Sequence, residues 1–377
     1  MRQRKNMGIY IRGTGLFTPK ESISNEELVE SYNSYVDIFN EDNKESIKKG
    51  EVESLTYSDP GFIKKASGIE SRFVINKDGI LDPRRMKPRL NKREDYELSI
   101  QAEIAIEASK QALINSDRDA SDIDGVICAC ANLQRAYPAV SIEIQGELGI
   151  EGYAYDMNVA CSSATFGIQN AVNDIRSGVA KTLLVVNPEI CTAHLNFKDR
   201  DGHFIFGDVC TALIIEKTDN EELGSFEIID TKLKTSFSNN IRNNFGFISK
   251  NEDLDLYSDD QLFKQEGRKV FKQVVPMVQE LIENHLEKNN LSIENIKRLW
   301  LHQANLNMNS LIAKRLLGRN PTEEEMPTVL NEYANTSSAG SIIAFHKYST
   351  DLEKGDLGVI CSFGAGYSVG SIIVQRT

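Results

Sequence analysis

Short apolar runs alternate along the whole chain with stretches whose apolar residues recur at helical spacing. The apolar runs predict strands over residues 8–17, 125–131, 156–160, 182–188, 209–217, 225–234, 296–302, 358–363 and 367–374. The periodic stretches predict helices over residues 94–115, 139–148 and 266–285, with others starting after Ser24, Cys161, His302 and Asn335. Alternation of this kind is typical of an α/β fold with mostly parallel sheets.

One segment interrupts this alternation. Residues 36–60 are mostly polar and predict an inserted, partly helical excursion. It follows a capping box, in which Ser24 and Glu27 are spaced to satisfy the first backbone N–H groups of a helix toward Tyr35.

A weak internal repeat is also visible. Residues 160–164 (ACSSA) resemble residues 334–339 (ANTSSA), and each precedes a predicted helix and then an apolar strand. The similarity is either chance or the trace of a duplicated βα unit. A true duplication would place Cys161 and Asn335 close to a shared axis.

Composition narrows the class of protein. The 377 residues, 40% of them hydrophobic and 26% charged, fit a globular chain of two packed halves rather than a fibrous or disordered one. The net charge of -12 disfavours general binding to nucleic acid or to an anionic membrane. No run is long enough to span a membrane, and the six cysteines fit buried thiols in a reducing compartment, so we expect a cytoplasmic protein.

Three side chains and one turn are candidates for chemistry. Cys161 precedes a helix, whose dipole would lower the pKa of its thiol, although a buried structural cysteine fits the pattern too. His302 ends an apolar strand, where α/β folds place reactive groups, or it is a packed polar residue. Asn335 also fits a plain helix N-cap. The glycine-rich turn at residues 363–367 is either a simple hairpin or a source of backbone N–H groups for an oxyanion.

Other chemistry finds little support in the sequence. The spacing of Cys128 and Cys130 does not match a metal site, and no second pair completes one. There is no phosphate-binding P-loop. His285 and His346 lie in predicted helices and are interpreted as surface residues.

Cys161 in VACSSA, His302 in HQAN and Asn335 in ANTSSAGS occur in an order that resembles the Cys-His-Asn set of the thiolase-fold condensing enzymes. Within them the chain is most similar to β-ketoacyl-acyl-carrier-protein synthase III, and the similarity extends over nearly the whole chain through GTGLFTP, FGD, EGR and FGAGYSVGS. The polar insert and the NLQRAYP stretch resemble the long-form synthases of the β-ketodecanoyl type, which prime with a medium-chain acyl-CoA.

The resemblance implies a five-layered αβαβα fold made of two duplicated halves, here residues 1–220 with the cysteine and residues 221–377 with the histidine and asparagine. It also implies a homodimer that needs no cofactor and no metal. Its substrates would be an acyl-CoA and a malonyl-acyl-carrier protein, joined by decarboxylating Claisen condensation at the start of fatty acid biosynthesis.

The same resemblance assigns roles to residues. Cys161 would take the acyl group, while His302 and Asn335 would stabilise the enolate formed when malonate loses CO2. Backbone N–H groups of Cys161 and Ala365 would form the oxyanion hole. Tyr137 stands where the family has an aromatic residue that lines the partner subunit's acyl pocket, with ordinary interface packing as the alternative.

Carrier-protein docking departs from the family pattern. The family commonly has an arginine where this chain has Asn307. Lys314 and Arg315 on the same predicted helix are candidates for a basic docking face, or simply for a solvated one.

Three rival functions remain at this stage. The first is a related ketosynthase III-like enzyme of secondary metabolism, which condenses ketides or transfers acyl groups without decarboxylation. The second is a non-catalytic partner subunit, which the presence of Cys161 disfavours. The third is a thioester hydrolase.

Overall fold

The computed structural model of the chain describes residues 8–219, 225–251, 253 and 258–377. The main sheet of these residues has the strand order β11-β12-β13-β8-β1-β7-β6-β4-β5. Its strands are β1 (Gly8–Phe17), β4 (Gly125–Ala129), β5 (Tyr153–Met157), β6 (Thr182–Ile190), β7 (Asp208–Thr218), β8 (Phe226–Ser238), β11 (Ile296–Leu301), β12 (Leu357–Gly364) and β13 (Gly366–Arg376). The strands expected from the apolar runs are confirmed within a few residues at each end.

The sheet consists of two halves with the same internal pattern. In one half β1 pairs antiparallel with β7, β7 antiparallel with β6, and β6 parallel with β4. In the other half β8, β13, β12 and β11 repeat that sequence of antiparallel, antiparallel and parallel pairs. A short antiparallel contact between β1 and β8 joins the halves. The duplication is therefore real, while the predicted division between residues 220 and 221 lies outside the described residues.

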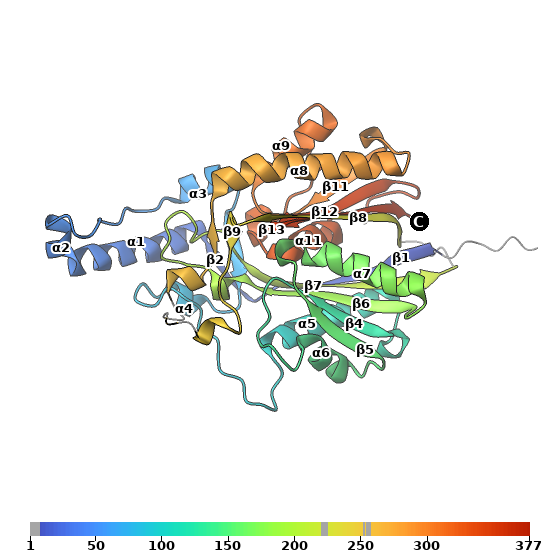
Figure 1. The fold of residues 1–377 in the computed structure, drawn as a ribbon, viewed down its shortest axis with the longest axis horizontal. Helices are drawn as coiled ribbons and strands as arrows, with labels where there is room; N and C mark the ends of the chain where they lie inside the picture. Colours follow the sequence, from blue (N-terminus) through green and yellow to red (C-terminus); the bar gives the residue numbers. More distant parts are fainter. Residues whose placement is uncertain (1–7, 220–224, 252, 254–257) are drawn as a thin grey trace, which may run out of the picture.

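Helices separate and cover the two half-sheets in five layers (Figure 1). The middle layer is α7 (Ser163–Ser177) with α11 (Gly340–Lys347), and both half-sheets pack against it. The outer layers are α5 (Ile100–Ser116) with α6 (Val140–Leu148) on one side and α8 (Gly267–Lys288) with α9 (Leu306–Leu317) on the other. The predicted αβαβα architecture is confirmed.

The strand β6 shows why the sheet is buried on both faces. Leu183 and Val185 pack against the middle helices, and the alternate residues Leu184 and Val186 pack against the outer ones. Successive strand residues point to opposite faces, so a continuous apolar run needs cover on both sides. Each such buried side chain contributes roughly 1.5–3 kcal/mol to folding.

The remaining elements form a lobe beside the sheet and the mouth of a cavity. They are α1 (Asn25–Asp42), α2 (Lys44–Lys48), α3 (Pro60–Ser67), α4 (Lys77–Leu81), α10 (Leu330–Tyr333), β2 (Glu21–Ser24), β3 (Ser71–Val74), β9 (Ile241–Arg242) and β10 (Lys264–Gln265). In Figure 1, α1 and α2 project from the body at the left.

The capping box is formed as predicted. Ser24 Oγ accepts the Glu27 backbone N–H at 3.2 Å, and Glu27 Oε2 accepts the Ser24 N–H at 3.0 Å. The helix runs on to Asp42, beyond the predicted end near Tyr35, so the excursion at residues 36–60 is partly helical, as expected. Over the described residues, no helix combines the length and apolar character that a membrane crossing requires.

Candidate active site

Two matching turns meet at the centre of the molecule. One leads through the 3-10 turn η2 (Ala160–Ser162) into α7, and the other through η7 (Ser337–Ala339) into α11. Both start on a residue with positive φ, 47° at Ala160 and 51° at Ser337. Matching these positions makes Ser338 the counterpart of Cys161. The sequence repeat predicts that Cys161 and Asn335 lie near a shared axis, and both line one cavity.

Asn335 has a different counterpart, Asn158. Asn335 Oδ1 accepts the backbone N–H of Ser337 at 2.8 Å, and Asn158 Oδ1 accepts that of Ala160 at the same distance. Each asparagine thus closes a tight side-chain turn in front of a helix.

The predicted site residues come together. Cys161, His302 and Asn335 all line one cavity of about 750 Å³. The Ser337 hydroxyl lies 3.6 Å from the Cys161 sulfur. Gly364, at the end of β12, packs so closely that a Cβ at this position would lie 2.6 Å from Cys161 Cβ and 3.1 Å from its sulfur. Cys161 therefore lies at the meeting point of the two halves.

The electrostatics of Cys161 contradict one expectation. Burial raises the pKa of its thiol to about 11, against the lowering effect of the Ser337 hydroxyl and of the backbone N–H groups of Cys161 and Ala365. The expected lowering by a helix dipole does not dominate, because α7 begins only at Ser163, after the η2 turn. The resting thiol is protonated near neutral pH.

The same two N–H groups fit the predicted oxyanion hole. Both act on the Cys161 thiol, and Ala365 lies at the tip of the hairpin between β12 and β13. The glycine-rich turn is therefore both a hairpin and a support for the cysteine. Because the donors are backbone groups, alanine in this turn preserves them.

His302 directly follows β11 and is fixed through its backbone. Its N–H donates to the carbonyl of Cys361 at 2.8 Å, and its carbonyl accepts from the Asn309 side chain at 2.9 Å. The ring packs edge-on against Phe363, with 5.2 Å between centroids. Burial lowers the pKa of His302 to about 3, so the imidazole is neutral and can donate a hydrogen bond.

A second cavity, of about 440 Å³, adjoins Cys161 from another side. Cys161, Ser337 and Ala365 contribute to its wall, together with Phe237 and Phe245. Both phenylalanines are largely exposed in the single chain. The cysteine is thus reached from two cavities, which the sequence did not predict.

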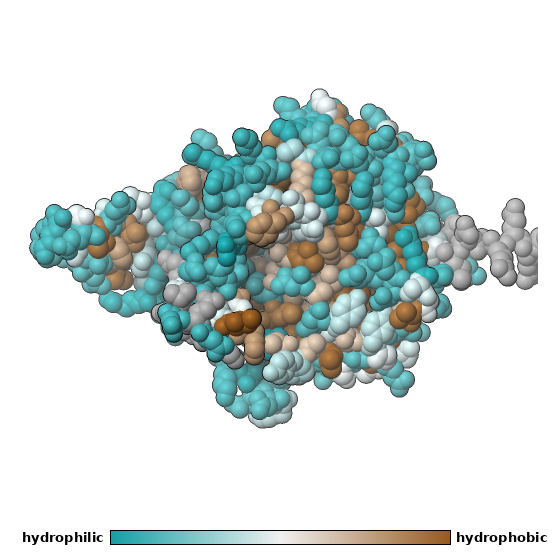
Figure 2. Space-filling view, viewed as in Figure 1, coloured by the Kyte–Doolittle hydropathy of each residue, from teal (hydrophilic) through white to brown (hydrophobic). Residues whose placement is uncertain are grey.

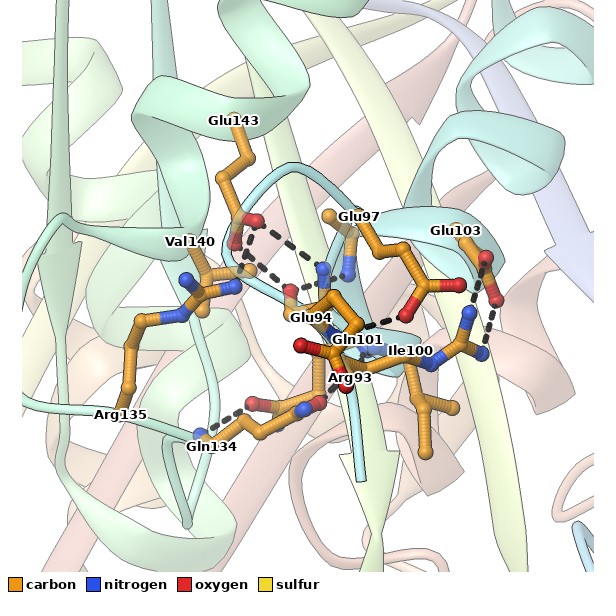
Figure 3. A network of polar contacts seen from close by, with 12 residues as sticks. Arg93, Glu94, Glu97, Ile100, Gln101, Glu103, Gln134, Arg135, Val140 and Glu143 are labelled. Atoms are coloured by element: carbon orange, nitrogen blue, oxygen red, sulfur yellow. Dashed lines mark hydrogen bonds and ion pairs between the residues drawn. The ribbon is translucent and has the colours of Figure 1, made fainter. Parts of the chain in front are cut away.

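Tyr137 lies on a tightly held loop but outside both cavities. Its side chain is 77% exposed. The Gln134 N–H ties the loop to the start of α5 by donating to the Gln101 side chain at 2.6 Å, and Arg135 ties it to α6 by donating to Glu143 at 2.6 Å (Figure 3). Glu143 also accepts the Ser99 N–H at 3.0 Å. The acyl-pocket role of Tyr137 remains a prediction, since it requires a partner subunit.

The docking candidates lie on the outer helix α9. Lys314 and Arg315 are exposed near its end, roughly 10 Å along the axis from Asn307 and Met308, which line the large cavity. The Asn307 side chain donates to the carbonyl of Ala66 at 3.2 Å, at the end of α3. Asn307 therefore joins two elements at the cavity mouth, where the family commonly has a cation.

Two further features complete the site. Among the described residues, no three His, Cys, Asp or Glu side chains are placed together to hold a metal ion. Glu189, near the end of β6, is fully buried behind the Asn335 turn, and burial raises its pKa to about 7. Sequence reasoning missed Glu189 and gave Ser337 no role, although a carboxylate in an otherwise apolar strand was a usable signal.

Comparison with known proteins agrees with this geometry. Residues 155–236 and 286–376 match the 3-oxoacyl-acyl-carrier-protein synthase III family and its C-terminal region. The chain is 58% identical over 349 residues to the β-ketodecanoyl-acyl-carrier-protein synthase of Pseudomonas aeruginosa, covering 92% of this chain and 100% of that one. The chain belongs to the β-ketoacyl-acyl-carrier-protein synthase III family.

More distant members of this family extend over the same length. The β-ketoacyl-acyl-carrier-protein synthase III of Clostridium perfringens is 28% identical, over 97% of this chain and 98% of its own. The crystal structure of the synthase III of Aquifex aeolicus shares the fold, with a TM-score of 0.75 at 22% identity, and covers 98% of this chain and 100% of that one.

Proposed function

We propose that this member of the synthase III family joins an acyl-CoA primer to malonyl-acyl-carrier protein by decarboxylating Claisen condensation, at the start of fatty acid biosynthesis. The observation that carries the proposal is the convergence of Cys161, His302 and Asn335 on one cavity. A nucleophile beside two neutral hydrogen-bond donors suits a reaction with an acyl-enzyme stage and an enolate stage.

In the first stage Cys161 attacks the thioester carbonyl of the primer. The carbonyl oxygen becomes an oxyanion, which the backbone N–H groups of Cys161 and Ala365 stabilise. The bond to CoA sulfur then breaks, CoA leaves as a thiol, and the acyl group remains on Cys161. A preorganised N–H pair of this kind contributes roughly 10²–10³-fold per donor to a rate.

In the second stage malonyl-carrier protein loses CO2, and the electron pair moves into an enolate. His302 is neutral because burial lowers its pKa to about 3, so it donates a hydrogen bond to the enolate oxygen without giving up a full proton. Asn335 has its oxygen held by the Ser337 N–H, which leaves Nδ2 for the same oxygen. The enolate carbon then attacks the acyl carbonyl on Cys161, the bond between that carbonyl carbon and the Cys161 sulfur breaks, and the β-ketoacyl-carrier protein leaves while the sulfur regains a proton. The residues present carry this sequence with the two substrates alone, so we propose that no cofactor or metal takes part.

The primer is a medium-chain acyl-CoA in this proposal. The 58% identical relative is named for a β-ketodecanoyl product, which corresponds to an octanoyl primer extended by one two-carbon unit. The second cavity beside Cys161, with Phe237 and Phe245 in its wall, is the proposed place of the acyl chain. The pantetheine arm would then enter through the larger cavity.

We further propose a cytoplasmic homodimer. β5 ends the main sheet, and its outer edge has no strand partner among the described residues. Figure 2 shows weakly polar and apolar residues gathered across the middle of the face on which α7 lies, between strongly polar regions. A second copy on this face would cover both, and it would receive the rigid loop that presents Tyr137 as a wall of the acyl pocket.

The carrier protein is the other proposed partner. Lys314 and Arg315 are adjacent exposed cations on a chain of net charge -12, and an acidic carrier protein would be steered to them. Replacing both by glutamate should raise the KM for malonyl-carrier protein several-fold at low salt, with little change in primer acylation.

The experiment that tests the function separates its two stages. Purified protein is offered acyl-CoA primers from acetyl to dodecanoyl with malonyl-carrier protein, and CO2 release and β-ketoacyl product are measured. We expect the octanoyl range to give the highest rates. His302→Ala should lose condensation at least 100-fold while Cys161 is still acylated.

Other results of this experiment would favour one of the rival functions. Acyl transfer without CO2 release would favour the related transferases, and steady release of free acid would favour a hydrolase. A folded His302→Ala variant that had lost all acylation would contradict the division of roles between Cys161 and His302.

A further inference from the structure

Glu189 is the one feature of the centre that the proposed reaction leaves without a task. Its side chain is fully buried on β6, in a strand whose other residues are also buried. Its carboxylate accepts the backbone N–H of Ala131 at 3.0 Å and that of Ser338 at 3.2 Å, and it forms a short hydrogen bond with the Ser338 hydroxyl. A buried carboxylate is costly unless it is paired in this way, and such groups concentrate at functional sites.

A single residue connects this carboxylate to the nucleophile. Ser337 lies next to Ser338, and its hydroxyl is 3.6 Å from the Cys161 sulfur. The same hydroxyl lies close enough to the Glu189 carboxyl to lower its pKa, while the neighbouring Ser338 binds that carboxylate directly through its N–H and its hydroxyl. A hydroxyl can donate and accept at once, so on rotation the Ser337 hydroxyl can relay a proton between the Cys161 thiol and the Glu189 carboxylate.

The acyl-transfer stage needs an acceptor for the thiol proton of Cys161. The Cys161 thiol is protonated at rest, because burial raises its pKa to about 11. His302 is a poor acceptor, because burial lowers its pKa to about 3. Glu189, with a pKa near 7, can both take up and return a proton at neutral pH.

The other titratable groups near Glu189 are four thiols and the carboxyl of Asp208 on the neighbouring strand β7. Cys128 lies on β4, Cys130 directly follows it, Cys191 follows β6 and Cys210 lies on β7. Burial raises the pKa of Cys191 and of Cys210 well above the ordinary range, and contact with Cys128 does the same for Cys130. For Cys128, the hydrogen bond with Cys130 has the largest effect and lowers the pKa, but burial and the nearby Asp156, Cys210 and Glu189 together raise it. Burial also raises the pKa of Asp208, to about 6. Glu189 and Asp208 are therefore the groups of this cluster that titrate near neutral pH, and Glu189→Gln separates their contributions.

We propose that Ser337 is a further catalytic residue and Glu189 a positioning residue, and that together they carry the thiol proton of Cys161 during acyl transfer. As the sulfur attacks the primer carbonyl, the S–H proton passes to Ser337 Oγ while the Ser337 hydroxyl proton passes to the Glu189 carboxylate. When the bond to CoA sulfur breaks, both transfers reverse and the proton leaves on the CoA thiol. The inference rests on the proposed function, in which Cys161 is acylated by an acyl-CoA.

The test measures the rate of Cys161 acylation by octanoyl-CoA between pH 6 and 9, by mass of the intact protein. In the wild type the rate should rise as Glu189 ionises near pH 7 and then level off. Glu189→Gln keeps the size of the side chain and an acceptor oxygen but removes the base. We expect acylation at pH 8 to fall about 100-fold and the step near pH 7 to disappear.

Alkylation of Cys161 by iodoacetamide is the matched readout. It depends on the fraction of thiolate, and the negative charge of Glu189 raises the pKa of Cys161. Glu189→Gln should therefore leave alkylation unchanged or make it faster, while acylation by octanoyl-CoA becomes slower. A merely structural role would slow both.

Ser337→Ala interrupts the proposed proton path at a second residue, because it removes the hydroxyl that carries the proton. Its acylation profile should match that of Glu189→Gln, and the double variant should be no slower than either single one, because both remove one proton path. An unchanged step near pH 7 in Glu189→Gln, a parallel loss of alkylation, or additive single effects would overturn the proposal. A wild type that octanoyl-CoA does not acylate would instead refute the proposed function.

Discussion

The two turns that meet at Cys161 have the same backbone geometry but differ in the hydrogen bonds of their asparagine side-chain NH2 groups. Asn158 and Asn335 each use Oδ1 to hold the N–H of the residue two positions later, at 2.8 Å. Asn158 also uses Nδ2, which donates to the carbonyl of Ala131 at 2.7 Å. Among the described residues, Asn335 Nδ2 has no such acceptor, and Asn335 lines the cavity with Cys161.

This difference shows how a duplicated fold acquires a single site. The duplication supplies the same geometry twice, namely a side-chain turn, a positive φ and a helix start. The reactive groups are then divided, because one turn presents a thiol and the other an unoccupied amide. The corresponding polar positions are tied to protein groups. Asn158 binds Ala131 within its own half, and Ser338 binds Glu189 across the two halves.

The largest effect is expected from a test that removes the asparagine Nδ2 donor from one turn or from the other, in separate variants. Asn335→Asp keeps the oxygen that closes the turn but loses the Nδ2 donor, and it should lower condensation by about 10²–10³-fold. Asn158→Asp loses only the bond to Ala131 and should change condensation less than tenfold. Steady-state CO2 release from both variants measures this. Equal losses would show that the two turns are not functionally distinct.

A second test concerns the close packing of the two halves, where Gly364 contacts Cys161. Gly364→Ala places a Cβ 2.6 Å from Cys161 Cβ, so one of the two residues must move. We expect acylation of Cys161 to slow at least tenfold, since displacement of a reacting group by 1 Å can cost about 100-fold. Gly146→Ala on α6 is the matched control, because a Cβ there meets nothing within 4 Å. An unaffected Gly364→Ala variant would refute the close packing at the cysteine.

A third test concerns the stability of the turn that carries Ser338. Burial raises the pKa of Glu189 from 4.5 to about 7, so the folded state holds its proton more tightly than the unfolded state. This stabilisation is complete below pH 4.5 and is lost as the pH rises through 7. Between these limits the wild type should lose on the order of 3 kcal/mol of unfolding free energy relative to Glu189→Gln. Denaturant unfolding at both pH values checks this, and parallel pH dependences would contradict it.

Much of the fold could be read from the sequence because its signals are local. The run over residues 125–131 is apolar throughout, and only a strand covered on both faces suits it; β4 is buried over its whole length. The capping box marks the start of α1 for the same reason, since both partners lie within one turn. The three site residues could be identified from the sequence because each lies at the beginning or end of such an element.

The errors concern properties that depend on distant contacts. His285 and His346 were interpreted as surface residues, but His285 is buried and bonds Ser371 of β13 at 2.9 Å, while His346 bonds Thr14 of β1 at 2.7 Å. The helical pattern around each histidine does not reveal which strand covers it.

The chemistry of Cys161 was misjudged for a related reason. Its pKa depends on burial between two half-sheets and on Ser337, which lies 176 positions away along the chain. The roles of Ser337 and Glu189 become visible only when the two turns are placed side by side.

The central claim is that Cys161 is the residue that receives the acyl group. The most direct test is incubation with octanoyl-CoA followed by mass measurement of the intact protein and of its peptides. The account predicts one octanoyl group per chain, on the peptide that contains Cys161, and none on Cys161→Ala. An adduct on any other cysteine, or persistent labelling of Cys161→Ala, would contradict it.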